Sequence, residues 1–120
     1  MTDHAEAETA ALSAADRWLA LVDRGDLHAS WSEASALFRA MVGEGEWEAS
    51  LARAQAPIGR PLAREIRSMR YATSLPGAPD GEYVVLEYET RFERKERGGE
   101  RVVMMKERDG EWRAAGYFVS

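Results

Sequence analysis

The chain contains no cysteine and no asparagine, and each absence excludes particular chemistry. Without cysteine there is no disulfide, no thiolate metal ligand and no cysteine nucleophile. Without asparagine there is no acceptor for N-glycosylation. No apolar run approaches the roughly 20 residues that a membrane-spanning helix needs. The sequence therefore predicts no membrane span.

The chain also lacks an excess of basic residues. Its 21 acidic residues outnumber its 16 basic residues, and the formal net charge is -5. Proteins that bind polyanions usually present clustered positive charge. We therefore expect no nucleic-acid partner.

Motifs that hold phosphates, metals or nucleophiles are absent from the sequence. It has no glycine-rich phosphate loop, no zinc-type or calcium-type ligand spacing and no nucleophile elbow. We therefore predict no metal site and no cofactor. Catalytic residues, if the chain has any, cannot be named from a motif.

The N-terminal segment MTDHAEAETAAL has neither the positive charge nor the apolar core of a signal peptide. As written, the chain is expected in the cytoplasm. If a signal peptide has been removed from a longer precursor, the protein would instead be periplasmic or exported.

The first half of the chain has the periodicity of amphipathic helices. Apolar residues recur at helical spacing over residues 11–22 and again over residues 27–41. Between them, Gly25 is placed to end one helix and Asp26 to cap the next, and Ser35 is a candidate cap for a further short helix. Helices are expected between about residues 5 and 56.

The sequence GDLHASW, at residues 25–31, contains the one histidine of the chain interior. On the expected second helix, His28 lies in the first turn and off the apolar stripe. Its neighbour Asp26 is two positions away, which does not place the two side chains face to face on a helix. We therefore interpret His28 as a solvated side chain rather than a catalytic one.

The second half of the chain, about residues 61–119, alternates like β-strands. Four strands are expected, and Asp109-Gly110 is a strong hairpin signal between the last two. In the first strand, the apolar face switches between Ile66 and Met69, which predicts a β-bulge there. The arginines of this strand are predicted to form a solvated sheet edge rather than a phosphate site; they are Arg60, Arg64, Arg67 and Arg70.

The faces of the last two strands depend on the length of the hairpin turn. A two-residue turn pairs Arg108 with Glu111 and directs Val103 and Met105 toward the core. An apolar patch would then lie on the outward face beside Glu87, Lys106 and Arg113, formed by Val102, Met104, Ala115, Tyr117 and Val119. Because exposed apolar patches usually mark contacts, we predict a homodimer through this sheet face.

This order of elements predicts an α+β fold with a single domain over residues 1–120. N-terminal helices, at about residues 5–56, would pack on a curved four-stranded antiparallel sheet at about residues 61–119. The predicted sheet has one face covered by helices and one face exposed.

A set of aromatic, small and turn residues extends over nearly the whole chain. It comprises Trp18, Asp23, Gly25, Ser30, Trp31, Ala34, Ser35, Phe38 and Trp47, then PIG at 57–59, LPGAPDGEY at 75–83 and DGEWRAAGY at 109–117. In this pattern the chain resembles an uncharacterised bacterial family, domain of unknown function 4019. The resemblance implies a nuclear-transport-factor-2-like (cystatin-like) superfold, in which helices and a curved sheet enclose a conical cavity. The family has no established catalytic residues, so the resemblance assigns none.

Two functions remain open for such a cavity. The first, which we favour, is a non-catalytic module that binds a small hydrophobic ligand or another protein. The second is a lyase, isomerase or hydrolase acting on a small hydrophobic substrate, for which the cavity would need an interior acid. The one carboxylate on the predicted concave face, Glu107, lies beside a turn, so Asp16 is the better candidate for that acid. The pocket candidates are Asp16, Trp18, Trp31, Tyr71, Tyr88 and Met105, although the tryptophans also suit an ordinary core.

Overall fold

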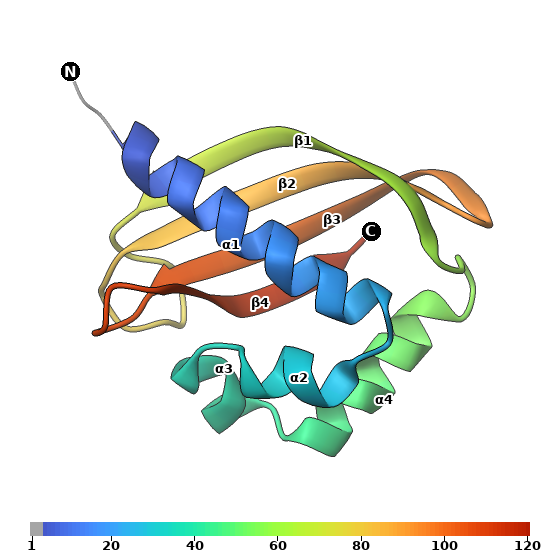
Figure 1. The fold of residues 1–120 in the computed structure, drawn as a ribbon, viewed down its shortest axis with the longest axis horizontal. Helices are drawn as coiled ribbons and strands as arrows, with labels where there is room; N and C mark the ends of the chain where they lie inside the picture. The colour runs from blue at the N-terminus through green and yellow to red at the C-terminus, as the bar shows by residue number, and fades with distance from the viewer. Residues whose placement is uncertain (1–3) are drawn as a thin grey trace.

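The computed structural model describes residues 4–120, in which four helices precede four strands (Figure 1). The helices are α1 (Ala5–Asp23), α2 (Leu27–Ser32), α3 (Ala36–Met41) and α4 (Glu44–Gln55). The strands are β1 (Pro61–Ala72), β2 (Tyr83–Phe92), β3 (Lys95–Lys106) and β4 (Trp112–Val119). The predicted α+β class is confirmed.

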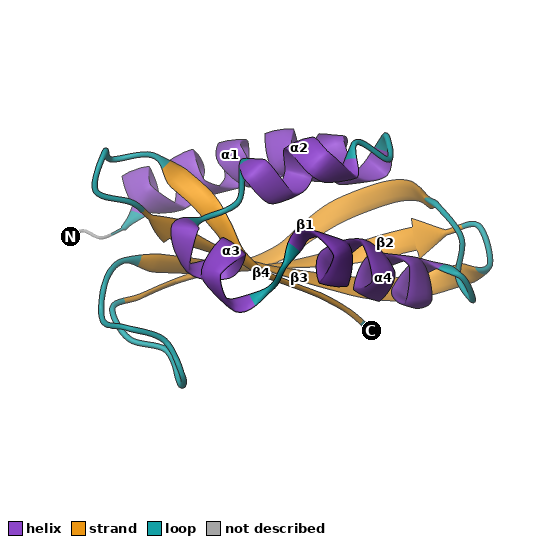
Figure 2. Ribbon diagram, turned by 90° about the horizontal axis from the view of Figure 1, so that it is seen from below, coloured by secondary structure: helices purple, strands orange, loops and turns teal. Residues whose placement is uncertain are grey.

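The strands form one antiparallel sheet in the order β1-β2-β3-β4. Helix α1 crosses one face of this sheet and contacts every strand (Figure 1). The three shorter helices lie beyond the β4 edge, where the Ser35 amide donates to the Ala114 carbonyl oxygen at 2.8 Å (Figure 2). No helix within residues 4–120 is both long enough and apolar enough to cross a membrane.

The core lies between α1 and the sheet and contains a cluster of aromatic rings. Trp18 of α1 is 4% exposed, and its ring centroid lies 5.8 Å from that of Trp47 and 5.9 Å from that of Tyr117. Trp47 also meets the ring of Phe38 edge to face at 5.4 Å.

The boundary between α1 and α2 follows the local sequence closely. Gly25 has a φ of 77°, a left-handed conformation that glycine adopts without steric cost. Its amide and that of Asp26 donate to carbonyls in the last turn of α1, which is a Schellman ending. Asp26 occupies the N-cap position of α2, but its side chain makes no capping hydrogen bond. The predicted Ser35 cap is confirmed, because its hydroxyl accepts from the Phe38 amide at 3.1 Å.

The predicted bulge in β1 is also confirmed. The pairing of β1 with β2 shifts register between Ile66 and Ser68. The extra residue returns Met69 to the face that Ile66 occupies, so both apolar side chains lie on the side of the sheet that α1 covers.

The turn between β3 and β4 is longer than predicted. The Glu107 amide donates to the Glu111 carbonyl oxygen at 2.8 Å, and the Gly110 amide donates to the Glu107 carbonyl oxygen at 2.8 Å. The loop therefore contains three residues, 108–110, and Lys106 pairs with Trp112. Because side chains alternate along a strand, this one-residue difference reverses the predicted faces of β3.

The reversal corrects the predicted outward patch. Val102 is 0% exposed and Met104 is 1% exposed, and both belong to the core. The pairing of β3 with β4 also shifts register between Val103 and Met104, where Ala115 is an extra residue on β4. Because of this extra residue, Tyr117 faces the core as well. Val119 faces the same way as Tyr117 because it pairs with Glu100 of the inward set.

The charged neighbours predicted for that patch are also placed differently. Glu87 pairs with Arg101, and Lys106 does not lie opposite it. Arg113 pairs with Met105, a predicted pocket residue that instead lies on the outer face of β3.

Candidate functional site

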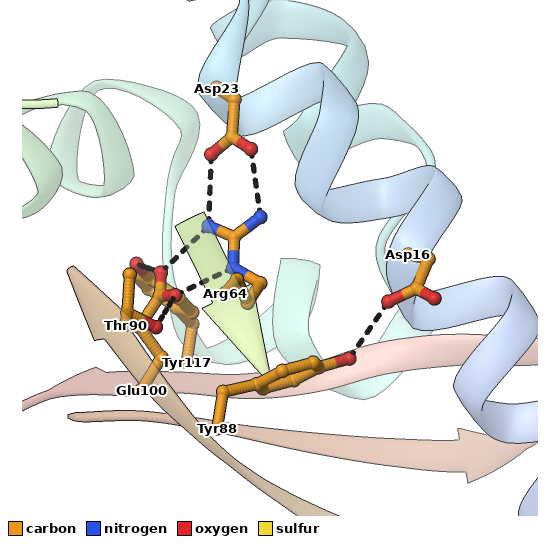
Figure 3. A network of polar contacts seen from close by, with 7 residues as sticks. All are labelled: Asp16, Asp23, Arg64, Tyr88, Thr90, Glu100 and Tyr117. Atoms are coloured by element: carbon orange, nitrogen blue, oxygen red, sulfur yellow. Dashed lines mark hydrogen bonds and ion pairs between the residues drawn. The ribbon is translucent and has the colours of Figure 1, made fainter. Parts of the chain in front are cut away.

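A network of polar side chains lies between α1 and the sheet (Figure 3). It joins four strands to one helix: Arg64 comes from β1, Thr90 from β2, Glu100 from β3 and Tyr117 from β4, while Asp23 ends α1. Within residues 4–120, no buried side-chain nitrogen or oxygen lacks a hydrogen-bond partner. Every buried polar side-chain atom of the network therefore has its hydrogen-bond partner within the protein.

Glu100 carries the most deeply buried charge of this network, with its side chain 1% exposed. Its Oε1 accepts from Arg64 Nε at 2.7 Å and from the Thr90 hydroxyl at 2.6 Å. Its Oε2 accepts from Arg64 Nη2 at 3.1 Å and from the Tyr117 hydroxyl. A carboxylate has about four lone-pair positions, so the hydrogen bonds within the protein occupy all the acceptor positions of Glu100.

Arg64 links this carboxylate to a second one. Its side chain is 16% exposed, Nη1 donates to Asp23 Oδ2 at 2.8 Å, and Nη2 donates to Asp23 Oδ1 at 3.1 Å. Burial alone would lower the pKa of Arg64, but its hydrogen bonds to Asp23 and Glu100 outweigh burial and raise the pKa further. Arg64 therefore stays charged and holds α1 to β1 and β3.

Two tyrosine hydroxyls act as donors in and beside this network. The Tyr88 hydroxyl donates to Asp16 Oδ1 at 3.1 Å, and the Arg64 guanidinium lies 5.9 Å from the Tyr88 ring centroid. Burial, and then the charge of Asp16, raise the pKa of Tyr88; burial, and then Glu100, raise that of Tyr117. Both phenols therefore remain protonated at neutral pH, and neither can act as a phenolate base.

A separate pocket of about 370 Å³ opens between the middle of α1 and the first residues of β4. Its volume falls within the range of about 300–1,000 Å³ that is usual for small-molecule sites. The apolar part of its lining comes from α1, β3 and β4 and consists of Ala14, Trp18, Met104, Trp112 and Ala114.

The polar part of this lining carries both signs of charge, from Arg17, Glu33, Glu111 and Arg113. Arg113 is tied to its own hairpin, where Nη2 donates to Asp109 Oδ2 at 3.0 Å. Arg17 donates to the Ser13 hydroxyl at 3.3 Å. Among residues 4–120, neither Glu33 nor Glu111 has a side-chain hydrogen bond or ion pair. The pocket therefore offers two free carboxylates beside a small exposed area of aromatic and aliphatic side chains.

Of the sequence-predicted pocket residues, Trp18 lines this pocket and the other five do not. Asp16, the candidate interior acid, is exposed on α1. Trp31 donates from Nε1 to the Val42 carbonyl oxygen at 2.8 Å, and the Tyr71 hydroxyl donates to Glu82 at 3.0 Å. These two side chains therefore serve local contacts. Tyr88 belongs to the polar network, and Met105 lies on the outer face of the sheet.

His28 is exposed, as predicted, but it is not without a partner. Its Nδ1 lies 2.7 Å from Glu44 Oε2, which raises the pKa of His28 through the hydrogen bond and the charge of Glu44. The contact ties α2 to the start of α4. No group of three or more histidine, aspartate or glutamate side chains within residues 4–120 is placed to hold a metal ion.

Sequence reasoning missed Glu100 and misjudged Arg64. Because the predicted faces of β3 were the reverse of the observed ones, Glu100 was expected on the outer face of the sheet. Arg64 was grouped with the solvated arginines of its strand. One signal for the network was present, because Thr90 is the one small polar side chain on the otherwise apolar face of β2. A buried hydroxyl at such a position requires a polar partner on a neighbouring strand.

Comparison with known proteins identifies a family but no activity. Neither a curated protein nor a solved structure matches the chain significantly. The nuclear-transport-factor-2-like superfold therefore stays a prediction. A family model, described as a protein of unknown function (DUF4019), matches residues 14–117. Because this match covers most of the chain, the protein belongs to the DUF4019 family.

Proposed function

We propose that this domain is a non-catalytic module that binds a small, mainly apolar molecule in the pocket between α1 and β4. The composition of that pocket carries the proposal. Trp112 and Trp18 border a space of about 370 Å³ with 9% and 4% of their surface exposed, and charged side chains supply most of the remaining exposed lining. A concave site where a small aromatic surface meets several charged groups can hold a small molecule that has an apolar body and a polar end.

The alternative, a lyase, isomerase or hydrolase, has less support. Such an enzyme needs an acid or base inside an open pocket, with its pKa shifted by its surroundings. The buried carboxylate of Glu100 is fully hydrogen-bonded and does not line this pocket. Glu33 and Glu111 are exposed at its mouth. This arrangement favours binding over proton transfer.

Filling the pocket should abolish binding without unfolding the protein. Ala14 is 8% exposed and lines the pocket from α1, so Ala14→Leu places a larger side chain in the space that a ligand would occupy. We expect the wild type to bind 3-phenylpropan-1-ol, a neutral probe with an apolar body, and Ala14→Leu to lose this binding. NMR titration measures it through shifts of the indole N–H signals of Trp18 and Trp112.

Ala10→Leu is the matched control, because Ala10 lies one turn earlier on α1 and is exposed. It should bind the probe as the wild type does. Shifts that appear at Trp31 instead of Trp112, or that survive in Ala14→Leu, would place the ligand elsewhere. Native mass spectrometry of protein purified without denaturation would then show whether a natural ligand accompanies it.

We also propose that two copies pair through the outer face of the sheet, with a surface that differs from the sequence prediction. Phe118 is 59% exposed on this face, and the half-buried Val103 and Met105 lie on the same side of neighbouring β3. The Glu87–Arg101 ion pair, at 3.0 Å, borders them. An apolar centre with charged neighbours suits a contact about a two-fold axis.

Sedimentation analysis tests this pairing. The molecular mass of the wild type from sedimentation should be about twice its chain mass of 13.4 kDa. The variant Phe118→Glu should remain folded but monomeric. Met41→Glu is the control, because Met41 is 66% exposed but lies on α3, away from the sheet face. A wild type that is monomeric at high micromolar concentration would rule out the dimer.

A further inference from the structure

We infer that the ligand of the α1–β4 pocket is a small organic cation, such as a protonated primary amine on an apolar body. The inference rests on the proposed binding function and adds the chemical class of the ligand. Its basis is the balance of unpaired charges around the pocket.

The basic residue on β4 contributes no free positive charge to the pocket. Arg113 Nη1 donates to Glu107 Oε1 at 3.1 Å and to Asp109 Oδ1 at 3.0 Å, and Nη2 donates to Asp109 Oδ2 at 3.0 Å. One guanidinium is therefore shared between two carboxylates. An anionic ligand would have to compete with both of them for Arg113.

The free carboxylates of the lining come from two different elements. Glu33 follows the last turn of α2, and Glu111 precedes β4. Within the described residues, neither carboxylate accepts a hydrogen bond or joins an ion pair. A cation between these elements would meet two acceptors that no side chain of the protein occupies. The net charge of the whole chain is -5, so its overall electrostatic field attracts cations, as the two pocket carboxylates do.

The aromatic part of the lining also favours a cation with an apolar body. Trp112 and Trp18 border the pocket with 9% and 4% of their surface exposed, and indole is the side chain to which organic cations are drawn most strongly. The indole N–H of Trp18 is directed to the Ser30 carbonyl oxygen at 2.7 Å. Met104 also borders the pocket but is 1% exposed, so it adds little to the surface that a ligand could contact.

One residue of the lining, Arg17, carries a charge that repels a cation. Its neutralisation should therefore change the affinity in the opposite direction from neutralisation of the glutamates. Arg17 on α1 is exposed, and its guanidinium contacts a neutral hydroxyl rather than a carboxylate. Its positive charge should weaken the binding of a cationic ligand. Neutralising Arg17 should therefore strengthen that binding, whereas neutralising either glutamate should weaken it.

Three probes that share one apolar body test the inference: 3-phenylpropylamine, 3-phenylpropan-1-ol and 3-phenylpropanoate. At neutral pH they carry a positive charge, no charge and a negative charge. We expect the amine to bind about three- to tenfold more tightly than the alcohol, as an exposed ion pair plus a cation–π contact would give. The acid should bind most weakly. Dissociation constants come from NMR titration, and the preference for the amine should decline at high salt.

Charge-neutralising variants then assign the preference to residues. Glu33→Gln and Glu111→Gln should each lower the ratio of amine to alcohol affinity, and Arg17→Gln should raise it. Glu48→Gln, on the exposed surface of α4, should keep the wild-type ratio.

Two failures are distinguishable. If the alcohol or the acid binds as tightly as the amine, the ligand class is wrong but the pocket still binds small apolar molecules. If none of the three probes shifts the indole signals of Trp18 and Trp112, the proposed binding function itself is wrong and the inference is lost with it.

Discussion

Arg64→Met is expected to lower the free energy of unfolding by about 3–5 kcal/mol, because it leaves a buried carboxylate without its counter-ion. The Glu100 side chain is 1% exposed, and two of its four hydrogen bonds come from Arg64. The loss should appear in urea denaturation as a lower midpoint with a similar slope.

Two further variants separate this explanation from a general loss of packing. Arg67→Met on the same strand should leave the midpoint nearly unchanged, since Arg67 is 56% exposed and its pairs with Glu65 and Glu89 are screened by water. Adding Glu100→Leu to Arg64→Met should recover part of the loss, because the uncompensated charge is removed. The recovery is incomplete because the hydroxyls of Thr90 and Tyr117 lose their acceptor. Equal losses for the two arginine variants would contradict a buried ion network.

Met104→Glu is expected to be the most damaging single change on β3, with a loss of about 4–5 kcal/mol or more. Met104 is 1% exposed, and it belongs to the core between α1 and the sheet. A glutamate there would have to lose its hydration among the apolar side chains of the core. Circular dichroism and urea denaturation would report a chain that is unfolded or close to unfolding.

Met105→Glu is the matched comparison, one residue away on the opposite face of the strand. Met105 pairs with Arg113 on β4 and lies on the face proposed for pairing of two copies, so both variants are compared on the Phe118→Glu background, where the new carboxylate is in contact with water. We expect a change of about 1 kcal/mol or less. If Met105→Glu proved the more damaging of the two, the hairpin would have the two-residue turn that the sequence suggests, and β3 would face the other way.

The features that the sequence predicted correctly are those with a local physical cause. Helical periodicity requires only that one stripe of a helix be apolar, and it located α1, α2 and α3. Gly25 ends α1 because its own conformation, with a φ of 77°, is cheap for glycine. Likewise, the bulge after Ile66 was visible as a change of apolar face within β1 itself.

The orientation of β3 was decided by the tertiary structure. Asp109-Gly110 suits both a two-residue turn and a three-residue loop, and the two differ by one position in the pairing of β3 with β4. Because the side-chain period of a strand is two, that single position moves Met104 and Glu100 from the outer face to the core. No pattern within β3 distinguishes the two registers, since Val102-Val103 and Met104-Met105 are apolar on both faces.

The candidate sites depend on contacts between residues far apart in the chain. Asp23, Arg64 and Glu100 each resemble an ordinary surface charge in the sequence, and only the packing of α1 across β1 and β3 brings them within hydrogen-bond distance. The pocket likewise exists because the middle of α1 and Glu33 come together with the first residues of β4. Local sequence thus determined the elements and their ends, whereas the buried charges and the pocket arise from non-local packing, which alone sets the relative positions of those elements.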